Sequence, residues 1–178
     1  PRQACTALIE NYVKNDGDIV TVAPLTKFPL VRDLIIDRSI MFENLRKVHA
    51  WVYVDDANER GPGPKISPAE QEVMYKLSTC ISCGCCLEAC PQVNDNSAFI
   101  GPAAISQARL FNIHPIGKKE SDKRFKTLMG EGGIGDCGNA QNCVRVCPKE
   151  IPLTESIAAI GRETSLYALK KIFSLKRS

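Results

Sequence analysis

Eight of the nine cysteines in the 178-residue chain fall into two short clusters, and this clustering constrains the fold more than any other feature. The first cluster has the spacing Cys-x2-Cys-x2-Cys-x3-Cys-Pro, from Cys80 to Pro91. Bacterial ferredoxins use this spacing to place three thiolates around one iron–sulfur cluster and the fourth on a second cluster. A zinc site uses two separated pairs of ligands, and adjacent cysteines leave few disulfide geometries, so the motif favours iron and sulfide.

The second cluster repeats the first motif with one ligand replaced. Cys137, Cys143 and Cys147 match the first, third and fourth cysteines, and Ala140 stands where the second is expected. Because alanine offers no donor atom for a fourth iron, this motif predicts a 3Fe-4S cluster. The alternative is a 4Fe-4S cluster with water or another side chain on the fourth iron.

The ligands of each cluster follow from the rule that the fourth cysteine of each motif crosses to the other cluster. We expect a 4Fe-4S cluster held by Cys80, Cys83, Cys86 and Cys147. We expect a 3Fe-4S cluster held by Cys90, Cys137 and Cys143. Cys85 falls out of register and is interpreted as a packed small side chain or a thiol behind the ligands, although a loop shifted by one residue would let it replace Cys86.

A glycine-rich run over residues 130–135 precedes the second motif. A phosphate-binding loop would lead into a helix, whereas this run leads into Cys137. We therefore expect a tight loop whose backbone N–H groups approach the cluster sulfurs.

Composition and charge exclude several classes of protein. An apolar share of 44% with 24% charged residues is typical of a globular chain, not of a disordered one. A net charge of +3 is too small to indicate nucleic-acid binding. No apolar run approaches the roughly 18 residues of a membrane-spanning helix. No set of serine, histidine and carboxylate suggests bond-breaking catalysis, so we expect electron transfer and no substrate chemistry in this chain alone.

Several polar residues are given no function. His49 and His114 are isolated histidines, which are more often structural than ligating. One basic run is interpreted as a solvated helix face, with a docking surface as the alternative; it comprises Lys118, Lys119, Lys123, Arg124 and Lys126.

Helix and turn signals place the cysteines in a mostly helical region. Ser67, Pro68 and Glu70 predict a helix that begins with a capping box. Further helices are expected over residues 38–48, capped by Asp37, and over 102–111, 121–129 and 152–173. Residues 18–22 are rich in β-branched side chains and predict a short strand. Alternating glycines and prolines over 58–64 predict a domain junction.

Three further segments resemble a known family. They are Arg-Gln-Ala-Cys at 2–5, Phe-Pro-Leu-Val-Arg-Asp-Leu at 28–34, and Asn-Cys-Val-Arg-Val-Cys-Pro-Lys at 142–149. With the two motifs and Ala140, they make nearly the whole chain similar to the iron–sulfur subunit of succinate dehydrogenase and fumarate reductase. The resemblance implies that electrons from succinate oxidation pass through 2Fe-2S, 4Fe-4S and 3Fe-4S clusters to a membrane quinone.

The resemblance also implies a division of the chain into three parts. Residues 1–37 are expected to be the C-terminal remnant of a β-grasp 2Fe-2S ferredoxin domain, and 38–64 a connecting helix and linker. Residues 65–178 are expected to form a mainly α-helical ferredoxin domain that binds the other two clusters. The family's last 2Fe-2S ligand sits where Cys5 stands, so Cys5 is expected to bind a 2Fe-2S cluster whose other ligands lie upstream. Without the family, Cys5 would be read as a buried thiol.

The partners implied by the resemblance are an FAD-bearing flavoprotein subunit, a membrane anchor subunit and a nearby quinone, with no nucleic acid. The chain would be peripheral on the cytoplasmic face of the bacterial membrane, or on the matrix side of the mitochondrial inner membrane. The resemblance suggests that ubiquinone-linked members carry a histidine directly after the cysteine equivalent to Cys137. They also carry aromatic residues shortly after the cysteine equivalent to Cys90. Here these places hold Gly138, Asn94 and Asp95. The departure favours a menaquinone-linked enzyme with a dihaem cytochrome b anchor.

Three alternatives stay open from the sequence. A fumarate reductase would use the same subunit in the reverse direction, because direction depends on the quinone and the flavin site. A soluble ferredoxin or a heterodisulfide-reductase-like subunit would carry both motifs intact, so Ala140 counts against it. A structural zinc protein would contain no acid-labile sulfide.

Overall fold

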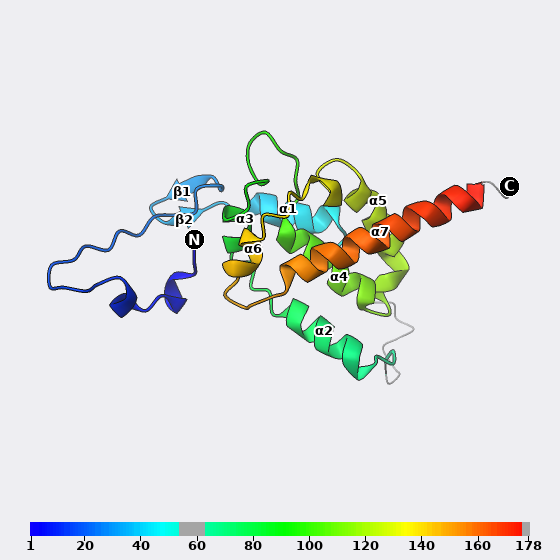
Figure 1. Ribbon diagram of the computed structural model, residues 1–178, viewed down its shortest axis with the longest axis horizontal. Helices are drawn as coiled ribbons and strands as arrows, with labels where there is room; N and C mark the ends of the chain where they lie inside the picture. Colours follow the sequence, from blue (N-terminus) through cyan, green and yellow to red (C-terminus); the bar gives the residue numbers. More distant parts are fainter. Residues whose placement is uncertain (54–62, 176–178) are drawn as a thin grey trace.

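Helix α4 (Pro102–Ile113) lies at the centre of the structure, with the longer helices packed around it (Figure 1). The computed structural model describes residues 1–53 and 63–175. Eight of the twelve residues of α4 are buried, and Arg109 is its only charged residue. A helix that is apolar on nearly every side belongs in the core, so α4 is the element against which the others are positioned.

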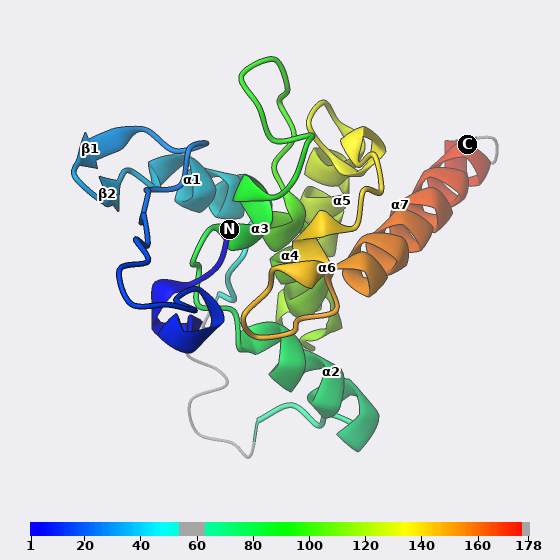
Figure 2. The same ribbon diagram turned by 60° about the vertical axis from the view of Figure 1, so that its left-hand side comes forward.

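The longer helices that contact α4 are α1 (Ser39–Lys47), α2 (Pro68–Ser78), α5 (Ser121–Met129) and α7 (Leu153–Leu175). Two single helical turns, α3 (Cys85–Glu88) and α6 (Asn142–Arg145), lie in the cysteine motifs. Short 3-10 turns are η1 (Ala4–Thr6), η2 (Ile9–Asn11), η4 (Gly117–Glu120) and η5 (Ile134–Asp136). The C-terminal half of α7 extends away from the bundle (Figures 1 and 2). In the part of the chain described, no helix has the length and apolar character needed to cross a membrane.

The predicted helices are confirmed to within two residues at each end. The capping box of α2 is present, since Ser67 Oγ accepts from the Glu70 backbone N–H at 3.3 Å and Glu70 accepts from the Ser67 N–H at 3.2 Å. The N-cap of α1 is Arg38, which makes no side-chain cap hydrogen bond, so the predicted cap, Asp37, lies one residue too early; it accepts from the Ser39 N–H at 2.8 Å. The capping signals therefore located the start of α2 correctly and that of α1 to within one residue.

The strand predicted over residues 18–22 is wrong. The segment is extended, but no described strand lies beside it, and Ile19 and Val22 are 91% and 61% exposed. A β-branched sequence forms a strand only where a partner accepts its hydrogen bonds. The small sheet is instead an antiparallel pair, β1 (Leu30–Arg32) with β2 (Ile35–Ile36), turned at Asp33, which has φ +52°.

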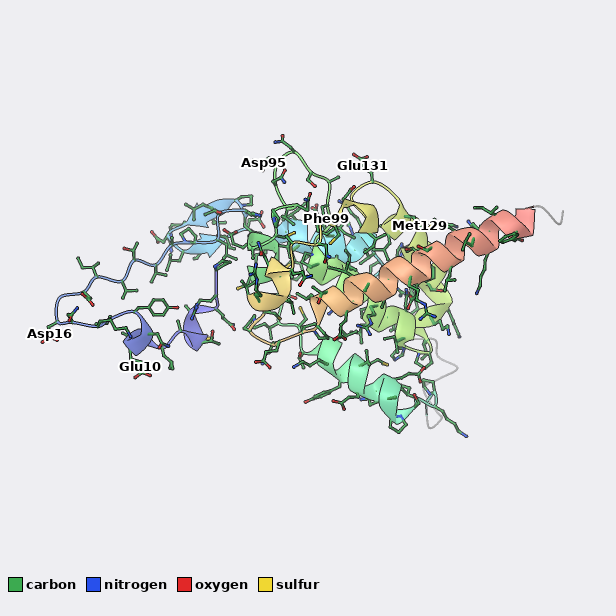
Figure 3. All side chains as sticks on the ribbon, viewed as in Figure 1. Glu10, Asp16, Asp95, Phe99, Met129 and Glu131 are labelled. Carbon is green, nitrogen blue, oxygen red and sulfur yellow. The ribbon has the colours of Figure 1, made fainter. Side chains whose placement is uncertain are left out.

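The N-terminal region reaches outward from the helices as an irregular segment. Figure 3 shows Glu10 and Asp16 near its outer end, opposite the C-terminal end of α7. The structure is about half helical with one two-stranded sheet, which agrees with a mainly α class. The junction predicted over 58–64 lies mostly outside the described residues, so the three-part division remains a prediction.

Arg124 of α5 corrects the interpretation of the basic run. Its neighbours Lys123 and Lys126 are exposed and pair with Glu120 and Asp122 on the surface, but the Arg124 side chain is fully buried. The guanidinium donates to the backbone oxygens of His49 at 3.0 Å, Trp51 at 3.1 Å and Gly117 at 2.6 Å. Arg124 thus ties the segment after α1 to the turn after α4, and the run is not a uniform solvated face.

Replacing Arg124 tests this role. Arg124→Met would remove the hydrogen bonds that a charged donor makes to three carbonyl oxygens, of which the His49 oxygen keeps a second donor, the Trp51 N–H at 2.8 Å. Each hydrogen bond from a charged group is worth about 1.5–3 kcal/mol. We expect a loss of stability of about 3 kcal/mol or more, seen as a lower midpoint in thermal unfolding of the holo-protein by far-UV circular dichroism. The matched control, Lys126→Met, removes only an exposed ion pair and should change stability by less than about 1 kcal/mol. Equal midpoints for the two variants would contradict the role given to Arg124.

Candidate iron–sulfur centres

Two cavities beside α3 and α6 are lined by cysteines from both motifs. The first is lined by Cys80, Cys83, Cys86 and Cys147. The second is lined by Cys90, Cys137 and Cys143. Within the described ranges no three ligand-type side chains converge tightly enough to hold a single metal ion. The thiols surround spaces, as ligands of a multi-iron cluster must.

The two single-turn helices distribute these cysteines between the cavities. In the first motif, Cys86 of α3 lines the first cavity and Cys90, which follows α3, lines the second. In the second motif, Cys143 of α6 lines the second cavity and Cys147 lines the first. The two turns lie side by side (Figures 1 and 2), and Asn142 donates to the backbone oxygen of Ala89 at 3.0 Å. Each motif therefore spans both cavities.

The backbone of the second motif repeats that of the first even where the ligand is missing. Left-handed residues flank Cys83 in the first motif and Ala140 in the second. They are Ser82 (φ +53°) and Gly84 (φ +84°) in the first loop, and Asn139 (φ +51°) and Gln141 (φ +59°) in the second. Such conformations are uncommon for residues other than glycine. Their recurrence places Ala140, which lines the second cavity, at the position corresponding to Cys83.

The first cavity has an apolar inner wall, and its four cysteines are partly exposed. Met41, Ala103, Ile151 and Leu153 line it, and all four are buried. Burial raises the pKa of Cys80, and burial followed by repulsion from Cys80 and other neighbouring thiolates raises that of Cys86. Without metal these groups are neutral thiols, whereas iron binds thiolates and thus displaces their protons. The Ile151 backbone N–H donates to Cys147 Sγ at 3.4 Å, an interaction suited to a negatively charged sulfur.

The second cavity is closed on its inner side by Phe99, Pro102 and Ile157. Burial raises the pKa of Cys143, so this cavity too disfavours a free thiolate. Its outer side is formed by residues 138–142, of which only Asn142 is not exposed. The donor set fits a cluster with three thiolate ligands.

Cys85 and Cys5 line neither cavity. Cys85 is buried, and burial followed by the neighbouring Cys83 raises its pKa to about 11, so it is a protonated packing thiol at neutral pH. Cys5 is exposed in η1 of the N-terminal segment. The expectation that Cys85 is packed behind the ligands agrees with its burial.

The glycine-rich loop does not do what its sequence suggested. None of residues 130–135 lines the three-cysteine cavity. The Gly132 N–H instead donates to Asp136 at 2.7 Å, and Gly132 (φ +75°) lies so close to Ala98 that a Cβ would approach its carbonyl oxygen to 2.1 Å. The glycines let the loop over residues 130–135 pack against the loop that follows Cys90. Glu131 lies near the tip of the first loop and Asp95 near the tip of the second (Figure 3).

One contact that no sequence pattern indicated fastens the N-terminal segment to the cysteine motif. Glu88 of α3 accepts from the Thr26 N–H at 3.0 Å, from Thr26 Oγ1 at 2.6 Å and from the Lys27 N–H at 3.0 Å. The Lys27 ammonium donates to the backbone oxygen of Cys90. The Glu88 carboxylate, two residues from both Cys86 and Cys90, thus anchors Thr26 and Lys27, which precede it by 62 and 61 positions in the sequence. Such a long-range pairing has no local sequence signal.

Comparison with protein families identifies the class of protein that these cavities define. A model described as a 4Fe-4S dicluster domain matches residues 76–151, and one described as a 2Fe-2S iron-sulfur cluster binding domain matches residues 1–43. The chain is therefore an iron–sulfur protein built from ferredoxin-type domains.

Curated relatives narrow this class. The succinate dehydrogenase iron-sulfur subunit of Bacillus subtilis is 50% identical over 177 residues, covering 99% of this chain and 68% of the relative. The fumarate reductase iron-sulfur subunits of Haemophilus influenzae and Escherichia coli O157:H7 are 32% and 34% identical, and the chain spans 64% and 60% of their length. The chain belongs to the family of iron–sulfur subunits of succinate dehydrogenase and fumarate reductase. Its resemblance to this family and its iron–sulfur cofactors are thereby confirmed.

A solved structure shares the fold. The Mycobacterium smegmatis Sdh1 complex in the apo form contains a chain that superposes with a TM-score of 0.73 at 23% identity, over 93% of this chain and 68% of that one. At this identity the likeness concerns the fold alone.

The Glu88 contact predicts how the N-terminal segment is held. Glu88→Gln keeps the size of the side chain but turns one acceptor oxygen into a donor, which then faces an N–H group. Losing a hydrogen bond to a charged group costs about 1.5 kcal/mol or more, so residues 24–29 should open about tenfold more often. We expect trypsin to cut after Lys27 about tenfold faster, measured by mass spectrometry, with iron content unchanged. Glu72→Gln, on the exposed side of α2, is the control, and an unchanged rate in Glu88→Gln would exclude the clamp.

Proposed function

We propose that this chain is the electron-transfer subunit of a succinate:quinone oxidoreductase. It would relay electrons from an FAD-bearing flavoprotein subunit to a membrane quinone through three iron–sulfur clusters, with no substrate chemistry of its own. The observation that carries the proposal is the distribution of seven cysteines between two adjacent cavities, four in one and three in the other, with Ala140 in the eighth position. The family membership supports it.

The proposed ligand sets follow the two cavities. A 4Fe-4S cluster would be held by Cys80, Cys83, Cys86 and Cys147, and a 3Fe-4S cluster by Cys90, Cys137 and Cys143. Bound there, the clusters would supply one-electron carriers. The chain's own contribution is to keep the two sites adjacent, because α3 and α6 each carry ligands of both, and to wall the first on its inner side with apolar side chains.

The N-terminal region is proposed to belong to the 2Fe-2S part of the subunit. The matched 2Fe-2S model over residues 1–43 supports this, and Cys5, exposed in that region, is the proposed ligand. We propose residues 1–37 as the end of a β-grasp ferredoxin domain, 38–64 as the connection, and 65–178 as the α-helical two-cluster domain. The clamp between Glu88 and residues 26 and 27 would keep the first part against the second.

The proposed partners are the flavoprotein subunit and a membrane anchor, on the cytoplasmic face of a bacterial membrane or the matrix face of the mitochondrial inner membrane. The 50% identity to a succinate dehydrogenase subunit favours succinate oxidation. Fumarate reduction is the second candidate, because several relatives bear that name. A heterodisulfide-reductase-like role is disfavoured by Ala140, since an intact second motif would place a cysteine there.

The quinone side of the proposal departs from ubiquinone-linked members. Those members share a histidine at the position of Gly138, where a Cβ would meet only the movable end of the Gln92 side chain. The adjoining open hollow of about 620 Å³ is polar, with Asn94 and Asp136 among its lining residues. Asp95, like Asn94, replaces an aromatic residue. These differences favour a menaquinone-linked enzyme, for which we propose a dihaem cytochrome b anchor.

The register of the first motif is tested by a pair of adjacent serine substitutions. Cys86→Ser should remove or degrade the 4Fe-4S cluster, because Cys86 lines the four-cysteine cavity, whereas Cys85→Ser should leave it intact, because Cys85 lines neither cavity. The measurement is iron and acid-labile sulfide per protein, with EPR of the reduced sample. Equal losses from the two substitutions would refute the ligand assignment, and zinc without sulfide in the wild type would refute the iron–sulfur function.

The missing ligand is tested by Ala140→Cys in the membrane complex. The repeated left-handed residues around position 140 should aim a new thiolate as Cys83 is aimed, converting the 3Fe-4S cluster to 4Fe-4S. The oxidised wild type should show the EPR signal of a 3Fe-4S cluster, and adding succinate should reduce that cluster. The oxidised variant should lack the 3Fe-4S signal. Each drop of about 59 mV makes one-electron reduction tenfold less favourable, so quinone reduction should fall while succinate oxidation with an artificial acceptor persists.

Ala140→Val, which adds bulk without a donor atom, is the control and should retain the 3Fe-4S signal. A wild type without that signal, or one whose clusters succinate leaves oxidised, would overturn the proposed function.

A further inference from the structure

Ser106 is a buried polar residue that no part of the function above uses. It lies in the middle of α4, and it is 1% exposed. Its Oγ is buried and makes no hydrogen bond with any described atom. A serine within a helix commonly donates to the carbonyl four residues earlier, which here belongs to Pro102, but Ser106 does not. A buried hydroxyl without a partner costs about 1–3 kcal/mol, so the missing partner calls for an explanation.

The place of Ser106 supplies one. It lines the four-cysteine cavity beside Cys80, Cys83, Cys86 and Cys147. The other residues of α4 and α7 that line this cavity, Ala103 and Leu153, carry no acceptor in their side chains. The acceptors that the proposed function puts into the space are sulfur atoms, either cluster sulfides or the thiolates themselves. A sulfur that carries negative charge accepts hydrogen bonds from hydroxyl groups.

We propose that Ser106 is a positioning residue whose hydroxyl donates a hydrogen bond to a sulfur of the 4Fe-4S cluster and raises its reduction potential. The proposal rests on the proposed function, because it requires a cluster in the first cavity. The O–H bond stays intact, and the cluster gains one electron from the preceding carrier. The hydrogen bond strengthens when that electron adds negative charge to the sulfurs, so it stabilises the reduced state more than the oxidised one.

The effect is specific to the first cluster. The second cavity is lined by no residue of α4 except Pro102, and its hydroxyl-bearing residue, Thr154, lies at the start of α7 and is partly exposed. A buried donor on only one of two adjacent sites shifts their relative potentials. Ser106 would thereby ease electron entry into the first cluster, which four thiolates otherwise make hard to reduce.

The test is Ser106→Ala in the intact complex, followed by EPR-monitored redox titration of both clusters. Alanine fits the space of serine and favours helix, so the fold should persist. At a fixed potential the ratio of reduced to oxidised 4Fe-4S cluster should fall about tenfold, a shift of about 59 mV, with no change at the 3Fe-4S cluster. The control is Thr164→Val, which removes a buried hydroxyl of α7 that lines neither cavity and already donates to Ile160 at 2.9 Å.

The outcomes separate this inference from the proposed function. A wild type that lacks the 4Fe-4S cluster refutes the ligand assignment. Suppose instead that the wild type holds both clusters. An unchanged ratio of reduced to oxidised 4Fe-4S cluster in Ser106→Ala, or an equal shift at both clusters, then overturns the role of Ser106 and leaves the proposed function standing. Should Ser106→Ala fail to retain the cluster, Ser106→Gly decides, because it also removes the hydroxyl and adds neither bulk nor a thiol that could bind iron. A lowered ratio in that variant supports the role, and an unchanged one overturns it.

Discussion

The electrostatic cost of bringing thiolates together in apolar surroundings governs this structure. Cys86 faces Cys80 and Cys147 across a cavity walled by buried aliphatic side chains, and as a free thiol its pKa is raised. Only a positively charged iron core makes such a site favourable for thiolates, so cluster binding and folding are coupled. The apolar core supports this arrangement, since buried residues of α2 and α4 belong to the same apolar cluster as Cys143, and Cys147 packs against that cluster.

The interleaving of the two motifs explains why the helical region forms one unit. Because Cys90 and Cys147 each cross to the cavity of the other motif, neither cavity can be completed by its own motif. The short helices α3 and α6 pack side by side, and under the proposed ligand assignment the clusters would also link them. Helix α4 lies behind both cavities. Its Ala103 and Ser106 line the first cavity, and its buried Pro102 lines the second.

Much of this arrangement was predictable because the signals are local. Cysteine spacing, the capping box at Ser67 and the periodicity of the long helices depend on neighbours within a few residues. Features that depend on distant contacts were not predictable. Residues 18–22 have strand composition but no described partner, Arg124 is indistinguishable in sequence from its exposed neighbours, and Glu88 meets Thr26 only in the folded chain. The orphaned hydroxyl of Ser106 likewise becomes visible only when its surroundings are known.

The Glu88 clamp has a consequence for the order in which the protein matures. The carboxylate that receives Thr26 and Lys27 sits on α3, a turn of four residues too short to be stable by itself. Under the proposed ligand assignment, binding of iron by Cys83, Cys86 and Cys90 would add to the packing that shapes this turn. The binding surface for the N-terminal segment would then be strengthened by cluster assembly, and a chain starved of iron would expose this segment to cellular proteases.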